Sequence, residues 1–550
     1  MKNGTIPYRF RFGVTGHRTL PDTAPLRSCV EAILGSRYKE ALTLEAGKEL
    51  SRAIHTPIAF TVISPLAEGA DRMVANAVIE NGGTLEVVLP MQQEEYEKDF
   101  SSAASRSEFA DLLKQARRVT VSEIDGNPTA ADFRKKAYLR AGQQTVECCD
   151  ILIALWDGEP SHGTGGTAEI IAFALQRKKP VFIVSTTQPG VLELKNGGTL
   201  EADTLTQLEN FNAFGINDMK MEQFQAEVFA EIFPAPAANN IPSEVKQAVA
   251  KHLIPSYCRA EKIAIHFQAH YLKAGFLGYC FATLSALLMA IAVVFVAHPL
   301  LSIPLYIGEV LLLVSLYLMI HRAKHGGVHS LWLGNRALAE RLRTAFYFAA
   351  CGESPAAATE ARSLYRHSHT WVNYACNEMF SQLPCFASPQ QSLRQYRDFV
   401  DACWLNGQID YHKRNADRRT NRNRQLEKGG LVCFASAIGV SIVHLAFAAM
   451  AANGHHAEGG MLLLEHVLSV VAIILPAAGA AVGGYRSLLE LSRIAARSTS
   501  TADRLLELKA RPLTADFSLR NYLQMIEEVM LIESEDWLAL MKHADLERVA

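Results

Sequence analysis

Four long apolar stretches constrain this 550-residue chain more than any other feature of its sequence. They cover residues 274–297, 303–320, 430–452 and 461–484. A helix of about 20 apolar residues crosses the hydrocarbon core of a bilayer, which is about 30 Å thick. Core helices of large soluble proteins are rarely so uniformly apolar over so many turns. The sequence therefore predicts four membrane-spanning helices arranged as two hairpins.

The charges that flank these stretches predict their orientation. The loops at 298–302 and 453–460 contain no Lys or Arg. The opposite flanks are basic and carry Arg322, Lys324, Lys413, Arg414, Arg418, Arg419, Arg422, Arg424, Lys428, Arg486, Arg493 and Arg497. Because basic flanks stay on the cytoplasmic side, we expect a multi-pass protein of the inner (plasma) membrane with both termini in the cytoplasm.

Two carboxylates, Glu309 and Glu465, lie inside the apolar stretches. Ionisable groups in lipid are costly and usually face protein or water, so both residues are pore candidates at the outer side of the bilayer. The alternative for each is a side chain that snorkels to the headgroups. The small residues AAGAAVGG at 477–484 let helix backbones approach closely. They indicate either an oligomer or pore-packing face, or packing inside one protomer.

Residues 1–187 alternate between short apolar runs and helical patterns. The expected strands are 9–14, 58–63, 85–89, 118–122, 151–155 and 180–184, with a helix at 70–80 among the segments between them. Continuous apolar runs are typical of parallel strands that are covered on both faces. The pattern predicts an α/β, Rossmann-like domain with a parallel sheet.

Glycine-rich and polar loops follow several of these strands. They read GVTGHR at 13–18, SPLAEGADR at 64–72, WDG at 156–158 and HGTGGTAE at 162–169, the last opening a helix at 170–176. Ligands of such sheets bind at the carboxyl ends of the strands, and free amides at a helix start favour phosphate. The candidate ligand-binding residues are Gly13, Thr15, Gly16, Arg18, Ser64, Gly69, Asp71, Arg72, Asp157, Gly163, Thr164, Gly165, Gly166, Thr167 and Glu169. For His17 and His162 a solvated loop position is favoured over a catalytic role.

Together these four motifs resemble the SLOG superfamily, a Rossmann-like group that includes the LOG and DprA-like proteins. The resemblance covers about a third of the chain and implies a nucleotide or nucleotide-derived ligand. Some LOG enzymes hydrolyse nucleoside monophosphates to free the base, with a PGGxGTxxE loop whose Glu is functional. The stretch at 162–169 lacks the proline and has a different glycine spacing, and Glu169 is the matching acid. The resemblance therefore makes Glu169 the candidate catalytic residue.

The segment WLGNRALAERLR at 332–343 is similar to the cytoplasmic helix of SLATT-type membrane effectors, which accompany nucleotide second messengers in bacterial anti-phage defence. Its spacing places Trp332, Arg336 and Glu340 on one helical face and predicts an ion pair between Arg336 and Glu340. The alternative interpretation is a helix that simply packs against its neighbours.

The remaining segments are expected to be mostly helical. Residues 188–272 form a linker that ends in an amphipathic helix at 243–272, which runs into the first hairpin at 273–320. Cytoplasmic helices at 321–428 and 486–550 flank the second hairpin at 429–485. The basic run 418–428 is interpreted as topology charge rather than as an anionic-lipid contact. The formal net charge of −2 does not indicate a nucleic-acid binder. The 10 scattered cysteines indicate neither a metal site nor a disulfide framework, and no cofactor is expected.

Three functions fit these features. The favoured one is a sensor of a nucleotide-derived signal coupled to a pore or membrane-disrupting effector, in a homo-oligomer within the lipid bilayer. The second is a membrane-anchored LOG-like enzyme that hydrolyses the glycosidic bond of a nucleotide, with Glu169 as general acid/base. The third, a transporter, is disfavoured because the chain has only four spans and no internal repeat that pairs with a substrate-sized polar patch.

Overall fold

The computed structural model describes residues 4–122, 131–160, 165–188, 190–195, 203–325, 327–353, 355, 370–384, 392–452, 460–512 and 518–542. The chain divides into two compact units. An α/β unit covers Thr5–Phe214, and a helical unit covers Gly215–Ala550 together with Met1–Gly4. The α/β unit therefore continues past residue 187, where the sequence placed its end.

In the described part of the α/β unit, seven strands form one sheet in the order β4-β3-β2-β1-β5-β6-β7. The strands are β1 (Tyr8–Gly16), β2 (Ile58–Ser64), β3 (Thr84–Leu89), β4 (Arg118–Val121), β5 (Ile151–Trp156), β6 (Val181–Ser185) and β7 (Leu192–Lys195). Six strands are parallel, at the positions that the sequence predicts. The predicted parallel sheet is thus confirmed for these six strands, and the whole sheet is mixed because β7 pairs antiparallel with β6 at the edge.

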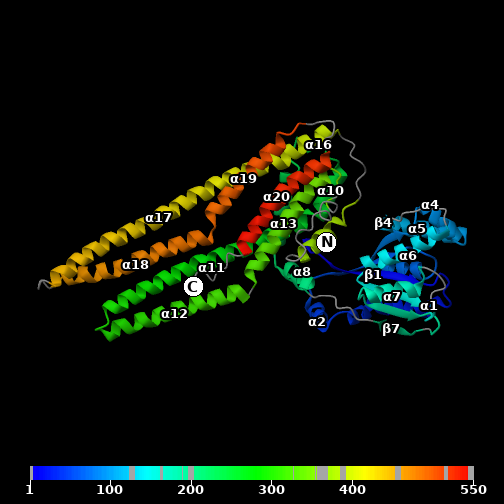
Figure 1. The fold of residues 1–550 in the computed structure, drawn as a ribbon, viewed down its shortest axis with the longest axis horizontal. Helices are drawn as coiled ribbons and strands as arrows, with labels where there is room; N and C mark the ends of the chain where they lie inside the picture. Colours follow the sequence, from blue (N-terminus) through cyan, green and yellow to red (C-terminus); the bar gives the residue numbers. More distant parts are fainter. Residues whose placement is uncertain are drawn as a thin grey trace. The chain divides into compact units, whose positions relative to one another are not determined.

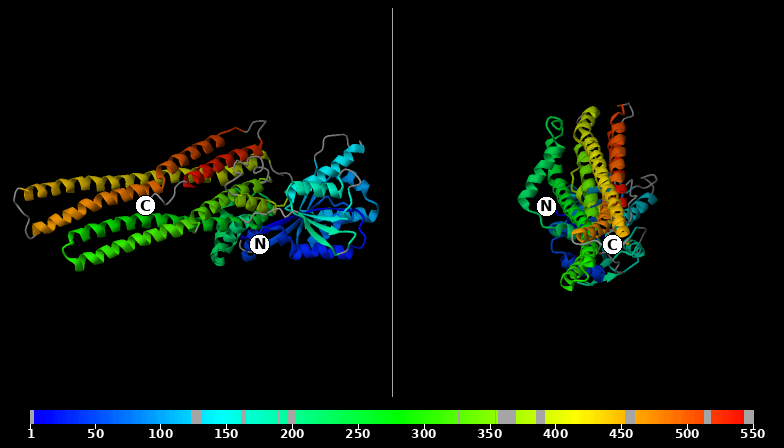
Figure 2. Two further views of the ribbon diagram at one scale, coloured as in Figure 1. Left: turned by 60° about the horizontal axis from the view of Figure 1, so that its bottom comes forward. Right: turned by 90° about the vertical axis from the view of Figure 1, so that its left-hand side faces the viewer.

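Helices cover both faces of this sheet (Figures 1 and 2). They are α1 (Thr23–Gly35), α2 (Leu44–Arg52), α3 (Ala70–Glu80), α4 (Gln93–Tyr96), α5 (Ala103–Gln115), α6 (Ala131–Cys148), α7 (Thr167–Gln176) and α8 (Asp203–Ala213), with short 3₁₀ turns at η2 (Arg37–Ala41) and η3 (Glu97–Asp99). Strand β5 shows why both faces need cover. Its Ile151, Ile153 and Leu155 lie in one core cluster, whereas Leu152 and Ala154 lie in the other. Alternate side chains of a strand point to opposite faces, so a fully apolar strand requires two cores.

The helical unit contains α9 (Asp218–Ile232), α10 (Ser243–His252), α11 (Ile254–Val294), α12 (Pro299–His325), α13 (Val328–Ala350), α15 (Thr370–Phe380), α16 (Leu393–Val400), the π-helical turn η4 (Asp401–Leu405), α17 (Asn406–Ala452), α18 (Gly460–Leu488), α19 (Leu491–Lys509) and α20 (Leu519–Lys542). The expectation of one helix over 243–272 is wrong. Helix α10 ends at His252, and α11 begins two residues later with Pro255 in its first turn. Proline fits a first turn but not a helix interior, because it lacks the N–H that an interior position donates.

Within the described residues, four helices are long and apolar enough to cross a membrane, as the sequence predicts, which is consistent with a membrane protein. Helices α11 and α12 form one hairpin, α17 and α18 form the other, and α11 packs along α18 (Figures 1 and 2). At most 22% of the residues in each apolar window are buried. Exposed apolar surface of this extent needs an apolar environment around it.

The small residues of α18 contact neighbouring helices of the same chain. A Cβ atom on Gly479 would lie 3.1 Å from the ring of Phe434 on α17. A Cβ atom on Gly484 would collide with the ring of Tyr279 on α11. These two glycines therefore let α18 approach its neighbours within one protomer, which is one of the two interpretations left open by the sequence.

Candidate functional site

A cavity of about 370 Å³ opens at the carboxyl ends of β1 and β5. These adjacent strands mark the point where the strand order reverses, which is where doubly wound sheets bind ligands. The volume lies in the range of small-molecule pockets. The lining residues are Val14, Thr15, Gly16, His17, Arg18, Pro65, Ala67, Asp71, Tyr96, Tyr138, Ala141, Gly142, Trp156, Asp157, Glu159, Pro160, Gly165, Gly166, Thr167, Ala168 and Ile170.

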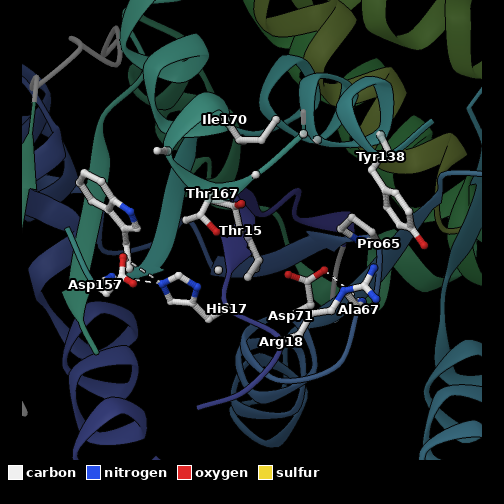
Figure 3. A pocket seen from close by; sticks show the side chains of 18 of the residues that line it. Thr15, His17, Arg18, Pro65, Ala67, Asp71, Tyr138, Asp157, Thr167 and Ile170 are labelled. Atoms are coloured by element: carbon white, nitrogen blue, oxygen red, sulfur yellow. Dashed lines mark hydrogen bonds and ion pairs between the residues drawn. The ribbon is translucent and has the colours of Figure 1, made fainter. Parts of the chain in front are cut away.

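The cavity has two polar ends (Figure 3). The side chains of His17 and Asp157 meet at one end, and Asp71 and Arg18 lie near Tyr138 at the other. The side chains of Thr15 and Thr167 lie between them. Eight of the sequence-predicted residues line this space: Thr15, Gly16, Arg18, Asp71, Asp157, Gly165, Gly166 and Thr167.

Gly69 acts through the backbone rather than by lining the cavity. Its φ of 80° is left-handed, and a Cβ atom there would collide with the carbonyl oxygens of His17 and Arg18. The Ala70 amide donates to the His17 carbonyl over 3.1 Å. The loops after β1 and β2 are therefore held backbone to backbone. Gly13 has a similar packing role, because a Cβ atom there would lie 2.8 Å from Cys149 Sγ.

Asp71 and Tyr96 are buried polar groups in the cavity wall. The Asp71 side chain is 5% exposed and its Oδ2 accepts a hydrogen bond from the Ala67 amide over 3.1 Å. Burial raises the pKa of Asp71 to about 7, against the opposing effects of that bond and of the Arg18 charge. Tyr96 is fully buried, burial raises its pKa, and within the described residues its hydroxyl has no hydrogen-bond partner. An unpaired buried hydroxyl is costly, so this wall retains hydrogen-bonding capacity that a ligand can use.

The two candidate arginines have different roles. Arg72 is 3% exposed, does not line the cavity, and donates to the Leu66 and Ser105 carbonyls over 3.2 and 2.9 Å. It also donates to Glu108 over 3.0 Å. Arg18 is exposed, lines the cavity, and stacks 5.2 Å from the centre of the Tyr138 ring. Arg18, rather than Arg72, is thus placed to meet an anion.

The Ser64 hydroxyl bonds to the protein backbone, because it accepts a hydrogen bond from the Leu66 amide over 3.0 Å. Its side chain is fully buried and does not line the cavity.

The glycine-rich loop before α7 brings backbone amides to the cavity. Gly166 occupies the N-cap position and supplies no side-chain cap. The first amides of α7 therefore lack a side-chain acceptor, and such amides bind anions. Glu169 does not line the cavity, and its Oε2 accepts a hydrogen bond from the Gly165 amide over 2.7 Å. Gly163 and Thr164, together with His162, lie outside the described residues.

At the other end, His17 and Asp157 join the loops after β1 and β5. His17 Nε2 lies 3.2 Å from Asp157 Oδ1 and 3.3 Å from the Asp157 amide. The pKa of Asp157 is lowered, first by a hydrogen bond from the Glu159 amide and then by His17. His17 is therefore a partly exposed loop residue that is bonded to Asp157 at the edge of the cavity. Adjacency of β1 and β5 in the sheet is what brings it there.

Tyr96 and Tyr138 were not identified from the sequence. They come from α4 and α6, which are not the segments that directly follow β1, β2 or β5. Neither residue lies in a glycine-rich motif, so no local signal marks it.

A second cluster of buried charges lies in the helical unit. Arg336 of α13 donates to both carboxylate oxygens of Glu261 on α11 over 3.1 Å, and it also pairs with Glu340, as its spacing predicts. Arg343 lies 3.1 Å from Glu340 and donates to the Tyr257 hydroxyl over 2.8 Å. The cluster thus joins α13 to the helix that continues into the first span.

His412 of α17 lies beside these charges. It is 3% exposed, and burial lowers its pKa to about 4, so the ring is neutral at physiological pH. Within the described residues its Nδ1 has no hydrogen-bond partner. The ring packs at the edge of Tyr411, with centroids 5.1 Å apart.

The pore candidates Glu309 and Glu465 are both half-buried. Glu309 lies on α12 and Glu465 on α18, whereas the extensive contact between the two hairpins is made by α11 with α18. Glu465 contributes its carbonyl to a chain of bonds, because Ser469 Oγ donates to it over 2.9 Å and lies 3.0 Å from His444 Nε2. In the described part of the chain, no group of three His, Cys, Asp or Glu residues is arranged to hold a metal ion.

Comparison with models of protein families, with curated proteins and with solved structures found no match to this chain. The functional argument therefore rests on the cavity and the four spans themselves.

Proposed function

We propose that this protein is a sensor of a nucleotide-derived signal that controls a membrane effector, with the SLOG-like and SLATT-like character that its motifs suggest. The observation that carries the proposal is the cavity at the ends of β1 and β5, bordered by the uncapped start of α7, in a chain that also has four apolar spans. An enzyme acting on a soluble nucleotide has no need of four spans, whereas a sensor that controls a membrane does.

The cavity offers separate contacts for the parts of a nucleotide. The amides at Gly166 and Thr167 and the guanidinium of Arg18 suit a phosphate. The rings of Trp156 and Tyr138 suit a base, since every base presents a π-face. The unpaired Tyr96 hydroxyl suits a sugar hydroxyl or a base edge. These contacts support a nucleotide-type ligand.

The ligand acts by favouring one of two arrangements of the chain, because equal affinity for both would shift neither population. In the favoured arrangement the spans open or disrupt the bilayer. Four helices enclose little space, so several copies of the chain build the pore. The charge pattern of the flanks supports a bacterial inner membrane, with both termini in the cytoplasm. Anti-phage defence is the setting that the two resemblances suggest.

Glycosidic-bond hydrolysis is less well supported. The catalytic candidate of that mechanism, Glu169, uses a carboxylate oxygen to hold the Gly165 amide and does not line the cavity. A general acid or base must reach the reacting bond within hydrogen-bond distance.

The first test is binding of cyclic and linear nucleotides to the full chain in detergent by calorimetry. Arg18→Gln is expected to weaken binding about tenfold or more, as for loss of a charge-assisted bond of about 1.5–3 kcal/mol. The matched control is Arg177→Gln, at the opposite end of α7 and outside the cavity, which is expected to leave affinity unchanged. Equal losses in both variants would contradict the assigned site.

The second test is ion leakage from liposomes that carry the purified protein. The nucleotide that binds is expected to trigger leakage in the wild type, and about ten times more of it is needed for Arg18→Gln. Binding without leakage across the panel would overturn the effector proposal. Release of free base from the bound nucleotide, abolished by Glu169→Gln, would replace it with the hydrolase.

A further inference from the structure

A second cavity lies in the helical unit, where the two hairpins meet. This groove has a volume of about 600 Å³ between α11 and α18, with the beginning of the second hairpin at one end. It is lined by Phe276, Tyr279, Cys280, Thr283, Leu284 and Leu287 of α11, by Arg422 and Leu426 of α17, and by Ile474, Ala478, Ala481, Val482 and Tyr485 of α18. The lining is apolar except at the end that carries Arg422.

The length of the groove matches one leaflet of a bilayer. It extends along α11 from Phe276 to Leu287 and along α18 from Tyr485 to Ile474. Each stretch covers eleven residue steps, or about 16 Å at the helical rise of 1.5 Å per residue. Half of a hydrocarbon core of about 30 Å is about 15 Å. The groove therefore reaches from the membrane surface to the middle of the bilayer.

The polar side chains of the lining fit this depth. Tyr279 and Tyr485 lie at the Arg422 end, and their rings pack edge to face 6.4 Å apart. Tyrosines are typical of the level of the lipid headgroups. The hydroxyl of Thr283, one turn deeper, already has a partner, because it donates to the Tyr279 carbonyl over 2.9 Å. The deep end then consists of apolar side chains.

Arg422 places a positive charge at one end of the groove. It is exposed, and within the described residues it makes no hydrogen bond or ion pair. The nearby acidic residue Glu427, five residues further along α17, pairs instead with Arg486 over 3.7 Å. Arg422 therefore offers a free cation at the mouth of an apolar groove of leaflet depth, which is complementary to an anionic headgroup above an acyl chain.

We infer that this groove binds one anionic phospholipid, with an acyl chain between α11 and α18 and the headgroup phosphate on Arg422. Ala478 and Ala481 keep the groove open where larger residues would fill it. The site is separate from the nucleotide cavity, and it gives part of the basic run at 418–428 a role beyond membrane topology.

The test is native mass spectrometry of the full chain, extracted in mild detergent and exchanged with equal amounts of phosphatidylglycerol and phosphatidylcholine of the same acyl chains. The wild type is expected to retain phosphatidylglycerol about fivefold more than phosphatidylcholine, which corresponds to about 1 kcal/mol for one cation near the membrane surface. Arg422→Gln removes this preference. The matched control Arg424→Gln, two residues along α17 and outside the groove, keeps it.

A second pair of variants tests the groove itself. Ala478→Leu is expected to abolish retention of both lipids, whereas Ala480→Leu, on the exposed side of α18, leaves it intact. A phosphatidylglycerol with a photoreactive group at the chain end is expected to label the peptides that contain Leu287 or Ile474. Equal retention of both lipids, equal loss in both arginine variants, or labelling elsewhere would overturn the inference. A change of oligomer mass in Ala478→Leu without loss of lipid would assign the groove to a second copy instead.

Discussion

Both units bury ionisable side chains, but they satisfy them differently. In the helical unit, Arg336 and Arg343 share the carboxylate of Glu340, and further partners complete their bonds. In the α/β unit, the hydroxyl of Tyr96 has no partner within the described residues, and Asp71 lies in the same cavity wall. In the first arrangement each charged side chain has a partner of opposite charge, although the neutral ring of His412 beside it does not use its Nδ1. In the second, the Tyr96 hydroxyl has no partner within the described residues.

This difference indicates that the charge cluster stabilises the helical unit, whereas the cavity of the α/β unit is suited to binding a ligand. A closed network of buried charges holds helices in one arrangement, and removing one member leaves the others without compensation. A wall with unpaired groups beside an open cavity costs free energy in the absence of a ligand. The cavity is therefore expected to respond to pH and ligand, and the cluster of α13 to respond mainly in stability.

The largest expected effect is the pH dependence that Asp71 gives to the stability of the α/β unit. Its folded-state pKa of about 7 lies above the ordinary value of 3.8, so the folded state binds more protons between these values. The resulting stability is fully present below about pH 4 and is lost as the pH rises through about 7. The shift of about three units corresponds to about 4 kcal/mol. Asp71→Asn is therefore expected to stabilise the α/β unit at pH 8 and to leave it unchanged at pH 4.

Hydrogen–deuterium exchange of peptides that cover β1 and β5 measures this prediction, with variant and wild type compared at each pH. Slower exchange of the variant at pH 8 is expected. A variant that exchanges at the wild-type rate at both pH values would show that folding does not raise the pKa of Asp71, and it would remove the contrast between the two regions.

The next effect concerns the closed cluster. Glu340→Gln leaves Arg336 and Arg343 without the carboxylate that they share. The free energy of unfolding is expected to fall by about 3 kcal/mol. This value is at the lower end for a buried ion pair, because the Arg336 side chain is 28% exposed. The control Glu427→Gln breaks the exposed pair with Arg486 and is expected to cost less than about 1 kcal/mol. Thermal unfolding of the full chain in detergent compares the two. Equal melting temperatures would mean that the cluster does not support the helices.

The smallest effect distinguishes two tyrosines of the cavity. Tyr96→Phe removes a hydroxyl without a partner, so the free energy of unfolding is expected to change by less than about 0.5 kcal/mol, while nucleotide affinity falls about fivefold. Tyr138→Phe removes a hydroxyl that donates to Asp99 and is expected to destabilise the unit by about 1 kcal/mol. Unfolding and calorimetric binding are measured on both. A loss of stability in Tyr96→Phe with unchanged affinity would make its hydroxyl structural.

Much of the framework was predictable, because it depends on neighbours in the sequence. The six parallel strands are continuous apolar runs, and α3 has the predicted bounds of 70–80. Strand β7 could not be recognised, because Leu192–Lys195 is a short alternating edge segment whose pairing depends on β6. The break between α10 and α11 was missed although Pro255 marks it, because the apolar periodicity continues on both sides.

The site was predictable only in part. The loops after β1, β2 and β5 were identified because glycine and polar clusters at strand ends are local signals. Arg18 and Arg72 were equivalent candidates in the sequence. Their separation depends on Ser105 and Glu108 of α5, which hold the Arg72 guanidinium away from the cavity.

By itself, the sequence determined that this chain has four apolar spans and a sheet with glycine-rich loops at its strand ends. Apolar length, flanking charge and glycine content are properties of contiguous residues. Only the tertiary structure decided which polar groups are buried with partners and which are buried without them. It placed Tyr96 beside Asp71 and Arg422 at the mouth of a groove between hairpins. Such placements depend on helices that are distant in sequence, and no local pattern encodes the direction in which their side chains meet.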